Sequence, residues 1–172
     1  MCAKVAPEVG DDWKLTEDFV EATMGENPLV SDAMKKAIGV SSEPVTYEVE
    51  KGHIKRFAEA IGDGNHIWHN ELSARETPLG GIVAPPTFLR MCIPSDLDKL
   101  ELPFDRGLDG GSEWTYFVPV RPGDSITVTQ KITGFNEKNG RLGQMLIENR
   151  EMFYKNQLGE LVATQKVVSI SY

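Results

Sequence analysis

The sequence of 172 residues has few cysteines, a deficit of positive charge and no long apolar run. Its two cysteines, Cys2 and Cys92, lie far apart without His or Cys neighbours at metal-ligand spacing, which argues against a disulfide framework and a zinc site. We expect both to be reduced thiols, with Cys92 in the core. A formal net charge of −8 argues against broad nucleic-acid binding, which needs a basic surface.

No apolar segment approaches the roughly 20 residues that cross a bilayer, and the N-terminal residues lack the apolar centre of a signal peptide. The cytoplasm is therefore the expected location. The remaining composition, 40% hydrophobic and 26% charged residues, is typical of globular proteins. A chain of this length predicts one domain with a well-filled core.

The N-terminal zone, Asp11–Val40, mixes apolar and charged residues in a pattern that suits two short amphipathic helices separated at Asn27-Pro28. We expect residues 1–44 to form a helical extension. Residues 45–172 would then form the main domain.

Helical spacing recurs in the middle of the chain, after a short alternating segment that begins near Tyr47. The apolar residues at positions i, i+3, i+4 and i+7 are Ile54, Phe57, Ala58 and Ile61. Gly62 is placed to end this helix, because glycine readily takes a positive φ. A short helical piece near Glu71–Arg75 follows, and a further apolar helix is predicted to begin near Pro86.

The C-terminal zone holds four segments rich in β-branched and aromatic residues, at 112–120, 124–135, 143–156 and 160–172. Turn signals separate them at 121–124, 137–140 and 156–159. Consecutive strands with tight connections predict an antiparallel meander. The apolar helix after Pro86 is available to cover it, so the expected fold class is α+β, a long helix packed on a curved antiparallel sheet.

Two motifs in fixed order carry a family resemblance. The loop Gly62-Asp63-Gly64-Asn65 precedes "GGIVAPPTFL" at 80–89 and strands that contain "PVRPGD" at 119–124. This order resembles the MaoC-like hydratases and dehydratases of the hotdog fold, in their N-terminal, fatty-acid-synthase-type dehydratase branch. Such enzymes interconvert 2-enoyl and (R)-3-hydroxyacyl thioesters of coenzyme A or acyl carrier protein. The resemblance over Tyr47–Tyr172 therefore implies a hotdog domain, an acyl thioester substrate and no separate cofactor or metal.

The loop departs from the active pattern of this family, G-D-x-N-P-[LIV]-H with a small residue six positions beyond the histidine. The matching residues are Gly62, Asp63, Asn65, Ile67 and Ala74. The proline position is His66, and the histidine position is Trp68. Because indole is only a hydrogen-bond donor, Trp68 cannot replace a base that takes a proton from water.

Pro86 is the second departure from the family. Active members commonly place glycine at this point in the first turn of the central helix, with its N–H on the thioester carbonyl, and proline has no N–H. The resemblance implies that Gly81, Ile82, Val83, Ala84, Pro86 and Thr87 bind the acyl thioester, together with Trp68. We expect Trp68 to form an apolar plug or pocket wall, with its indole N–H hydrogen bonded.

The resemblance implies catalytic roles for Asp63 and Asn65. From the residues alone, both are equally typical of a turn or cap behind a helix-ending glycine. His69 is a candidate replacement for the missing base, although a neighbour of Trp68 in an extended segment would point to the opposite side. We expect Glu148 to be an ordinary exposed strand charge, and Trp114, Tyr116 and Phe117 to fill the core.

Three functions follow from this pattern. The favoured one is a hotdog subunit of an (R)-specific hydratase or dehydratase that shapes the acyl channel and pairs with a catalytic hotdog subunit. The second is an active homodimer that uses Asp63, Asn65 and His69. The third is a non-catalytic module that binds acyl thioesters. Pairing is expected in the first two because hotdog proteins resemble each other in closing an open sheet edge by side-by-side association.

Overall fold

The computed structural model describes residues 29–97, 100–140 and 143–172. The first helix predicted in the extension lies outside these residues, as does Cys2. The second predicted helix is present as α1 (Asp32–Ala37). It begins where the side chain of Ser31 accepts a hydrogen bond from the backbone N–H of Met34, which satisfies a donor at the first turn.

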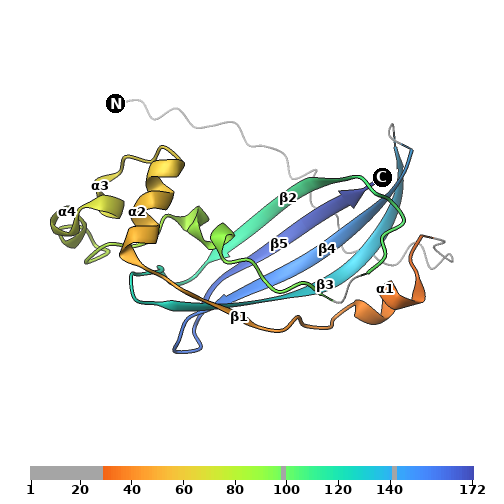
Figure 1. The fold of residues 1–172 in the computed structure, drawn as a ribbon, viewed down its shortest axis with the longest axis horizontal. Helices are drawn as coiled ribbons and strands as arrows, with labels where there is room; N and C mark the ends of the chain where they lie inside the picture. The colour runs from red at the N-terminus through yellow and green to blue at the C-terminus, as the bar shows by residue number, and fades with distance from the viewer. Residues whose placement is uncertain (1–28, 98–99, 141–142) are drawn as a thin grey trace, which may run out of the picture.

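Five strands form one curved antiparallel sheet in the order β1-β3-β4-β5-β2 (Figure 1). Their bounds are Val45–Glu48 for β1, Gly107–Tyr116 for β2, Ser125–Gly140 for β3, Gly143–Lys155 for β4 and Leu161–Ser171 for β5. Each segment that was predicted as a strand from its β-branched and aromatic residues forms a strand of this sheet.

The predicted meander is correct for β3, β4 and β5 but wrong for β2, which pairs with β5 and not with β3. The connection from β2 to β3 holds Pro119 and Pro122, which have no N–H for a strand ladder. The contact with β5 ends just beyond β2, where Phe117 N and Val118 N both donate to Val162 O, at 2.9 Å and 3.3 Å. The turn predicted at 137–140 is also wrong, because pairing continues until Gly140 meets Gly143.

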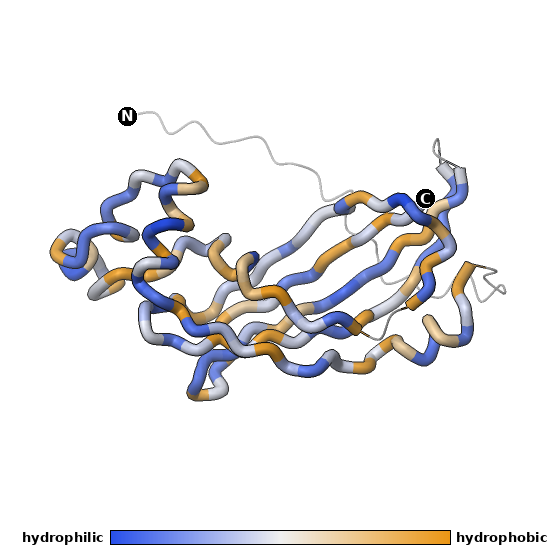
Figure 2. The backbone as a smooth tube through the Cα atoms, viewed as in Figure 1, coloured by the Kyte–Doolittle hydropathy of each residue, from blue (hydrophilic) through white to orange (hydrophobic). Residues whose placement is uncertain are grey.

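One face of the sheet is buried, and we call it the inner face. In the first half of β3 the buried residues alternate with half-buried ones. Figure 2 shows that hydrophobic and hydrophilic residues also alternate along the strands. Ile126, Val128 and Ile132 of β3 and Tyr154 of β4 are at most 1% exposed. A period of two places these side chains on the same face, where each contributes about 1.5–3 kcal/mol by leaving water.

Three helices lie together at one end of the sheet: α2 (Lys51–Ala60), α3 (His66–His69) and α4 (Glu71–Arg75) (Figure 1). The predicted helix is confirmed as α2, which buries Ile54 and Ala58. Gly62 has a φ of 70° just beyond it, the left-handed conformation that favours glycine at a helix end. The helical piece expected at 71–75 is confirmed as α4.

The long helix predicted after Pro86 is instead a 3-10 helix of 6 residues, η2 (Pro86–Met91). Pro94 explains its short length, because a proline disfavours helical backbone in the residue before it, here Ile93. η2 still covers the sheet, since Phe88 and Leu89 are buried in the same cluster as the inner-face residues. The α+β class with a curved antiparallel sheet is therefore confirmed, with a shorter covering helix.

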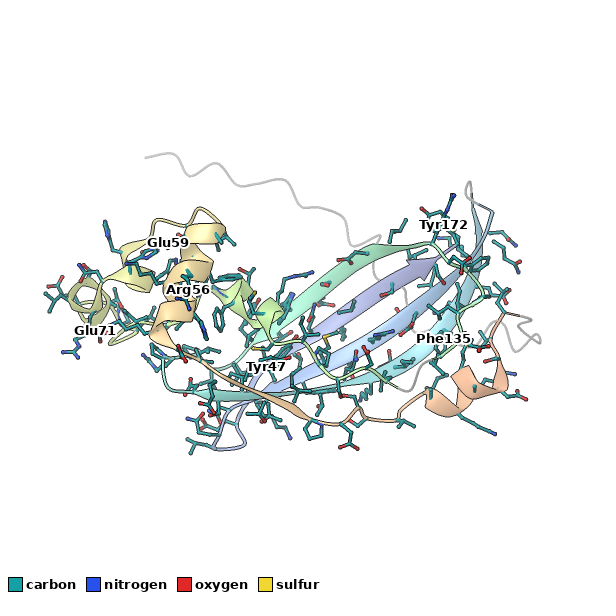
Figure 3. All side chains as sticks on the ribbon, in the orientation of Figure 1. Tyr47, Arg56, Glu59, Glu71, Phe135 and Tyr172 are labelled. Atoms are coloured by element: carbon teal, nitrogen blue, oxygen red, sulfur yellow. The ribbon has the colours of Figure 1, made fainter. Side chains whose placement is uncertain are left out.

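A second, smaller apolar cluster lies at the opposite end of the sheet from α2–α4, where Phe135 is labelled in Figure 3. There Met34 of α1, 0% exposed, packs with Val30 and Leu146. The described part of the extension thus contributes to the core of the main domain.

Cys92 is a free thiol and is 3% exposed, which confirms the prediction that it lies in the core. Burial raises its pKa to about 11, so the thiol stays protonated at neutral pH. Among the helices of the described residues, none is long and apolar enough to span a membrane.

Candidate functional site

The loop behind α2 is held by its own side chains. The backbone N–H of Asp63 donates to Ala58 O at 2.9 Å, and Asp63 Oδ1 accepts a hydrogen bond from Asn65 N at 3.0 Å. Asn65 Oδ1 in turn accepts from Ile67 N at 3.2 Å and caps α3. Both residues therefore have the turn and cap roles that their types predict.

His69 lies closer to Asp63 than its sequence position suggested. The segment around it is helical, so neighbouring side chains are rotated by a helical step and do not point to opposite sides as in a strand. The half-buried His69 ring places Nε2 3.2 Å from the carbonyl oxygen of Asp63. The structure thus brings Asp63, Asn65 and His69 into one loop.

Trp68 is buried, with 8% of its surface exposed. It belongs to the apolar cluster that contains Ala58 of α2, Phe88 of η2 and Val83. Its indole Nε1 is fully covered and has no hydrogen-bond partner within the described ranges. This burial agrees with the expectation of an apolar plug, and the expected partner of the indole N–H does not lie among the described residues.

Polar contacts fasten α4 to the first turn of α2. Asn70 Oδ1 caps α4 by accepting from Leu72 N at 2.9 Å and from Ser73 N at 3.2 Å. Glu71, labelled near the tip of this helical end in Figure 3, accepts from Lys51 Nζ at 2.8 Å and from Arg75 Nε at 3.2 Å. The hydrogen bond from Lys51 is the main reason that the pKa of Glu71 is lowered. Asn70 and Glu71 thus fix the C-terminal end of the loop that contains Asp63 and Trp68. The hydrogen bond from Asp63 N to Ala58 O fixes its N-terminal end.

The second motif enters the same core. Gly81, Ile82, Val83 and Ala84 are buried, and Ala84 N donates to Val120 O at 2.8 Å. Pro86 and Thr87, by contrast, are exposed. The structure therefore brings Trp68 and residues 82–84 into one cluster and leaves Pro86 and Thr87 at the surface, while their role in binding an acyl thioester stays a prediction.

A polar row on the inner face was not predicted. Glu148, which we expected to be an exposed charge, is 4% exposed and accepts a hydrogen bond from Arg150 Nε. Arg150 Nη1 lies 3.4 Å from Gln130 Oε1, and Gln130 Nε2 donates to Ser95 O at 2.7 Å. These partners offset the cost of burying the charge.

The burial of Glu148 could have been predicted from its position along β4. Leu146 and Tyr154 are 1% exposed and stand an even number of residues from Glu148, so all three side chains share the inner face. A hollow of about 420 Å³ lies beside Glu148, lined also by Asp109, Val167 and Ser169. None of the residues that line it belongs to the Asp63 loop or to residues 80–89, so it is separate from the candidate site.

The aromatic residues at the end of β2 and just beyond it differ in burial. Trp114 is half-buried and stacks on Tyr154 with ring centroids 5.4 Å apart. Tyr116 and Phe117 are 43% and 54% exposed, so the prediction that they fill the core is wrong. The reason is the strand order: β2 is an edge strand, which the sequence pattern did not reveal.

No group of three or more His, Cys, Asp or Glu side chains is placed to hold a metal ion in the part of the chain that the structure describes.

Comparison with known proteins identifies the family. Residues 36–165 match the family described as "FAS1-like, dehydratase domain region". The chain belongs to this family. A UPF0336 protein of Parafrankia sp. (strain EAN1pec) is 34% identical to this FAS1-like dehydratase-region chain over 125 residues, which cover 69% of the chain and 80% of the relative.

Solved structures confirm the MaoC-like hotdog fold of this dehydratase-region chain. The MaoC-like dehydratase from Rhodospirillum rubrum has a TM-score of 0.64 at 24% identity, over 79% of this chain and 92% of that one. A chain of the ChsH1-ChsH2 complex from Mycobacterium tuberculosis has a TM-score of 0.69 at 23% identity, over 81% and 88%. A chain of the HadBC (3R-hydroxyacyl-ACP dehydratase) complex from the same organism has a TM-score of 0.65 at 19% identity, over 83% and 100%.

In this member of the dehydratase family the loop retains an acid, Asp63, but the side chain at the histidine position cannot exchange a proton near neutral pH. Trp68 is, in addition, packed into the core. A catalytic role for Asp63 and Asn65 stays a prediction.

Proposed function

We propose that this chain is one subunit of an (R)-specific 2-enoyl-thioester hydratase or 3-hydroxyacyl-thioester dehydratase. It shapes the acyl channel and pairs with a second hotdog subunit that supplies the complete acid and base pair. Its substrate is an acyl thioester of coenzyme A or acyl carrier protein, and its place of action is the cytoplasm.

The observation that carries this proposal is the buried indole of Trp68 at the histidine position. Hydration of an enoyl thioester needs one group that takes a proton from water and one that delivers a proton to the α-carbon. With Trp68 in the core, the loop supplies only Asp63 directly for these two steps. A partner subunit with an intact loop supplies both.

An exposed edge supports the pairing. β2 is hydrogen bonded only to β5 on one side, and within residues 29–97, 100–140 and 143–172 no strand pairs with its other side. Leu108, Tyr116 and Phe117 are 42–54% exposed at this edge. An open apolar edge strand favours association. Two structural neighbours, ChsH1-ChsH2 and HadBC, are themselves complexes.

A second candidate function is an active homodimer, favoured by the position of His69. The Nε2 atom of this half-buried ring is 3.2 Å from the carbonyl oxygen of Asp63, so both titratable groups belong to one loop. In this alternative Asp63, oriented by Asn65, and His69 complete the proton transfers in each copy.

Turnover by the isolated chain separates these functions. We expect the purified chain to hydrate a short 2-enoyl-CoA no faster than the same preparation carrying Asp63→Asn, because neither has a competent base at position 68. Loss of absorbance of the enoyl thioester measures the rate.

A native rate well above the rate of Asp63→Asn would exclude the subunit proposal and favour the homodimer. In that case a His69→Gln variant is expected to lose the same activity. A chain that binds the acyl thioester but gives no turnover, even with a hotdog partner whose loop is intact, would instead indicate a binding module.

A further inference from the structure

A row of side chains with alternating charge crosses the outer face of the sheet, the face opposite the inner face. It begins at Lys131 of β3, which lies opposite Glu151 of β4, with Lys131 Nζ 3.2 Å from Glu151 Oε2. Glu151 also lies opposite Lys166 of β5, and Lys166 lies opposite Glu113 of β2. Directly opposite residues share one face of a sheet, where opposite charges attract. This charge row therefore runs positive, negative, positive, negative from β3 to β2.

The charge row ends at an open edge of the sheet. β2 pairs with β5, and in the described part of the chain no strand lies on its other side. Glu113 precedes Trp114, whose ring stacks on Tyr154 of the inner face, so Glu113 points to the outer face. Glu113 is exposed and makes no ion pair with another described residue. A strand added at this edge would therefore meet an available carboxylate.

The charge row specifies which side chain the added strand should carry. A Lys or Arg opposite Glu113 continues the alternation, whereas an Asp or Glu at that position is repelled. Pairing also removes water from the edge, which strengthens both the attraction and the repulsion. Charge at this one position therefore discriminates between partners.

A second copy of this chain lacks the required cation in its own edge strand. The sequence of β2 is GLDGGSEWTY, in which Asp109 and Glu113 are the charged residues and neither Lys nor Arg occurs. Self-pairing within β2 therefore places Glu113 opposite an uncharged or an acidic side chain. Neither arrangement continues the charge row.

The basic residues that flank β2 do not remove this limit. A register with Arg106 opposite Glu113 would run through the bulge between Asp109 and Gly111 in both copies. A register with Arg121 opposite Glu113 would run through position 119, where proline has no N–H for a strand ladder. The edge of β2 is thus better matched to a different chain than to a second copy.

We propose that β2 selects its partner by charge. It pairs with the edge strand of a different hotdog chain that carries Lys or Arg opposite Glu113, in preference to a second copy of this chain. Glu113 is then a residue that determines partner specificity, and the charge row continues into the sheet of the partner. This inference rests on the proposed function, because it takes the partner to be a second hotdog subunit.

The test measures pairing of the full chain with a second hotdog chain from the same organism whose loop reads G-D-x-N-P-x-H. Glu113→Lys reverses the charge at the edge, and Glu113→Gln removes it. The matched control is Glu76→Lys, which makes the same change in net charge at an exposed position at the end of α4. Analytical ultracentrifugation at low and high salt gives the dissociation constant of each pair and the self-association of each chain.

We expect Glu113→Lys to weaken the pair by about tenfold at low salt and Glu113→Gln by about threefold, since reversal adds repulsion to the lost attraction. High salt should reduce both differences. When each Lys and Arg of the partner's edge strand is changed to Glu in turn, one change should restore binding to Glu113→Lys. Glu76→Lys should bind like the native chain, and the native chain should self-associate more weakly than it binds the partner.

Three results would overturn the inference. If the native pair forms but Glu113→Lys binds as tightly, or if no charge change in the partner strand restores its binding, selection by charge is refuted and the subunit function stands. Self-association of the native chain as tight as its binding to the partner would refute the preference for a different chain. If the native chain does not bind the hotdog partner, the pairing in the proposed function is refuted and this inference with it.

Discussion

The double variant Trp68→His, Pro86→Gly is expected to give the isolated chain a hydratase activity that the native chain lacks. Histidine at position 68 and glycine at position 86 restore the base and the backbone N–H at the positions where the family pattern has them. Both substitutions are needed, because each restores one of the two groups that the family pattern describes.

The size of this effect follows from the two groups restored. A placed general base typically contributes about 10²–10⁴ in rate, and a donor to the developing oxyanion about 10²–10³. Core packing opposes this gain, because the imidazole fills less of the cluster that now buries the indole. We therefore expect a hydration rate at least about 100-fold above that of the control. Steady-state hydration of a short 2-enoyl-CoA measures it.

The matched control is Trp68→Phe, Pro86→Gly, which carries the same backbone change without a base. A triple variant that adds Asp63→Asn should lose the new activity again. Equal turnover by the phenylalanine control, or no turnover by a folded histidine variant, would contradict the role that we give to position 68.

Tyr154→Ala is expected to have the largest effect on stability, a loss of about 3–5 kcal/mol in the free energy of unfolding. Tyr154 is 1% exposed, stacks on Trp114 with centroids 5.4 Å apart and donates its hydroxyl hydrogen to Gln165 Oε1 at 2.9 Å. Burial raises the pKa of this phenol, which keeps it a neutral donor at every physiological pH. Truncation therefore removes packing and a buried hydrogen bond together.

Urea unfolding followed by circular dichroism measures the loss. Tyr154→Phe should cost only about 1 kcal/mol, because the ring and its stacking remain. Leu158→Ala is the surface control: Leu158 is 75% exposed in the turn between β4 and β5, and its truncation should change the stability by less than about 0.5 kcal/mol. A loss below about 1 kcal/mol in Tyr154→Ala would show that the inner face is not the principal core.

Local rules predicted the parts of this fold that depend on neighbours in sequence. The spacing of Ile54 and Ala58 predicted α2, the freedom of glycine at Gly62 predicted its end, and β-branched content predicted the strands. The short length of η2 could have been predicted in the same way, from the proline at position 94.

Pairings and environments that join distant residues were not predictable from the pattern. The side-by-side position of β2 and β5 depends on a crossing connection, and this edge position exposes Tyr116. The phase of β4 could have indicated the burial of Glu148, whereas the contact of Arg150 with Gln130 joins two different strands. The unpaired indole of Trp68 is a property of the whole cluster around it.

The most direct test of the account is turnover by a reconstituted pair. This chain is mixed with a second hotdog chain from the same organism whose loop reads G-D-x-N-P-x-H, and hydration of a 2-enoyl-CoA is measured for the pair. We expect turnover by the pair that falls by about 10²–10⁴ when the aspartate of the partner loop is changed to asparagine, and that persists with Asp63→Asn in this chain. A rate that instead depends on Asp63 would contradict the account, because the chemistry would then belong to this chain.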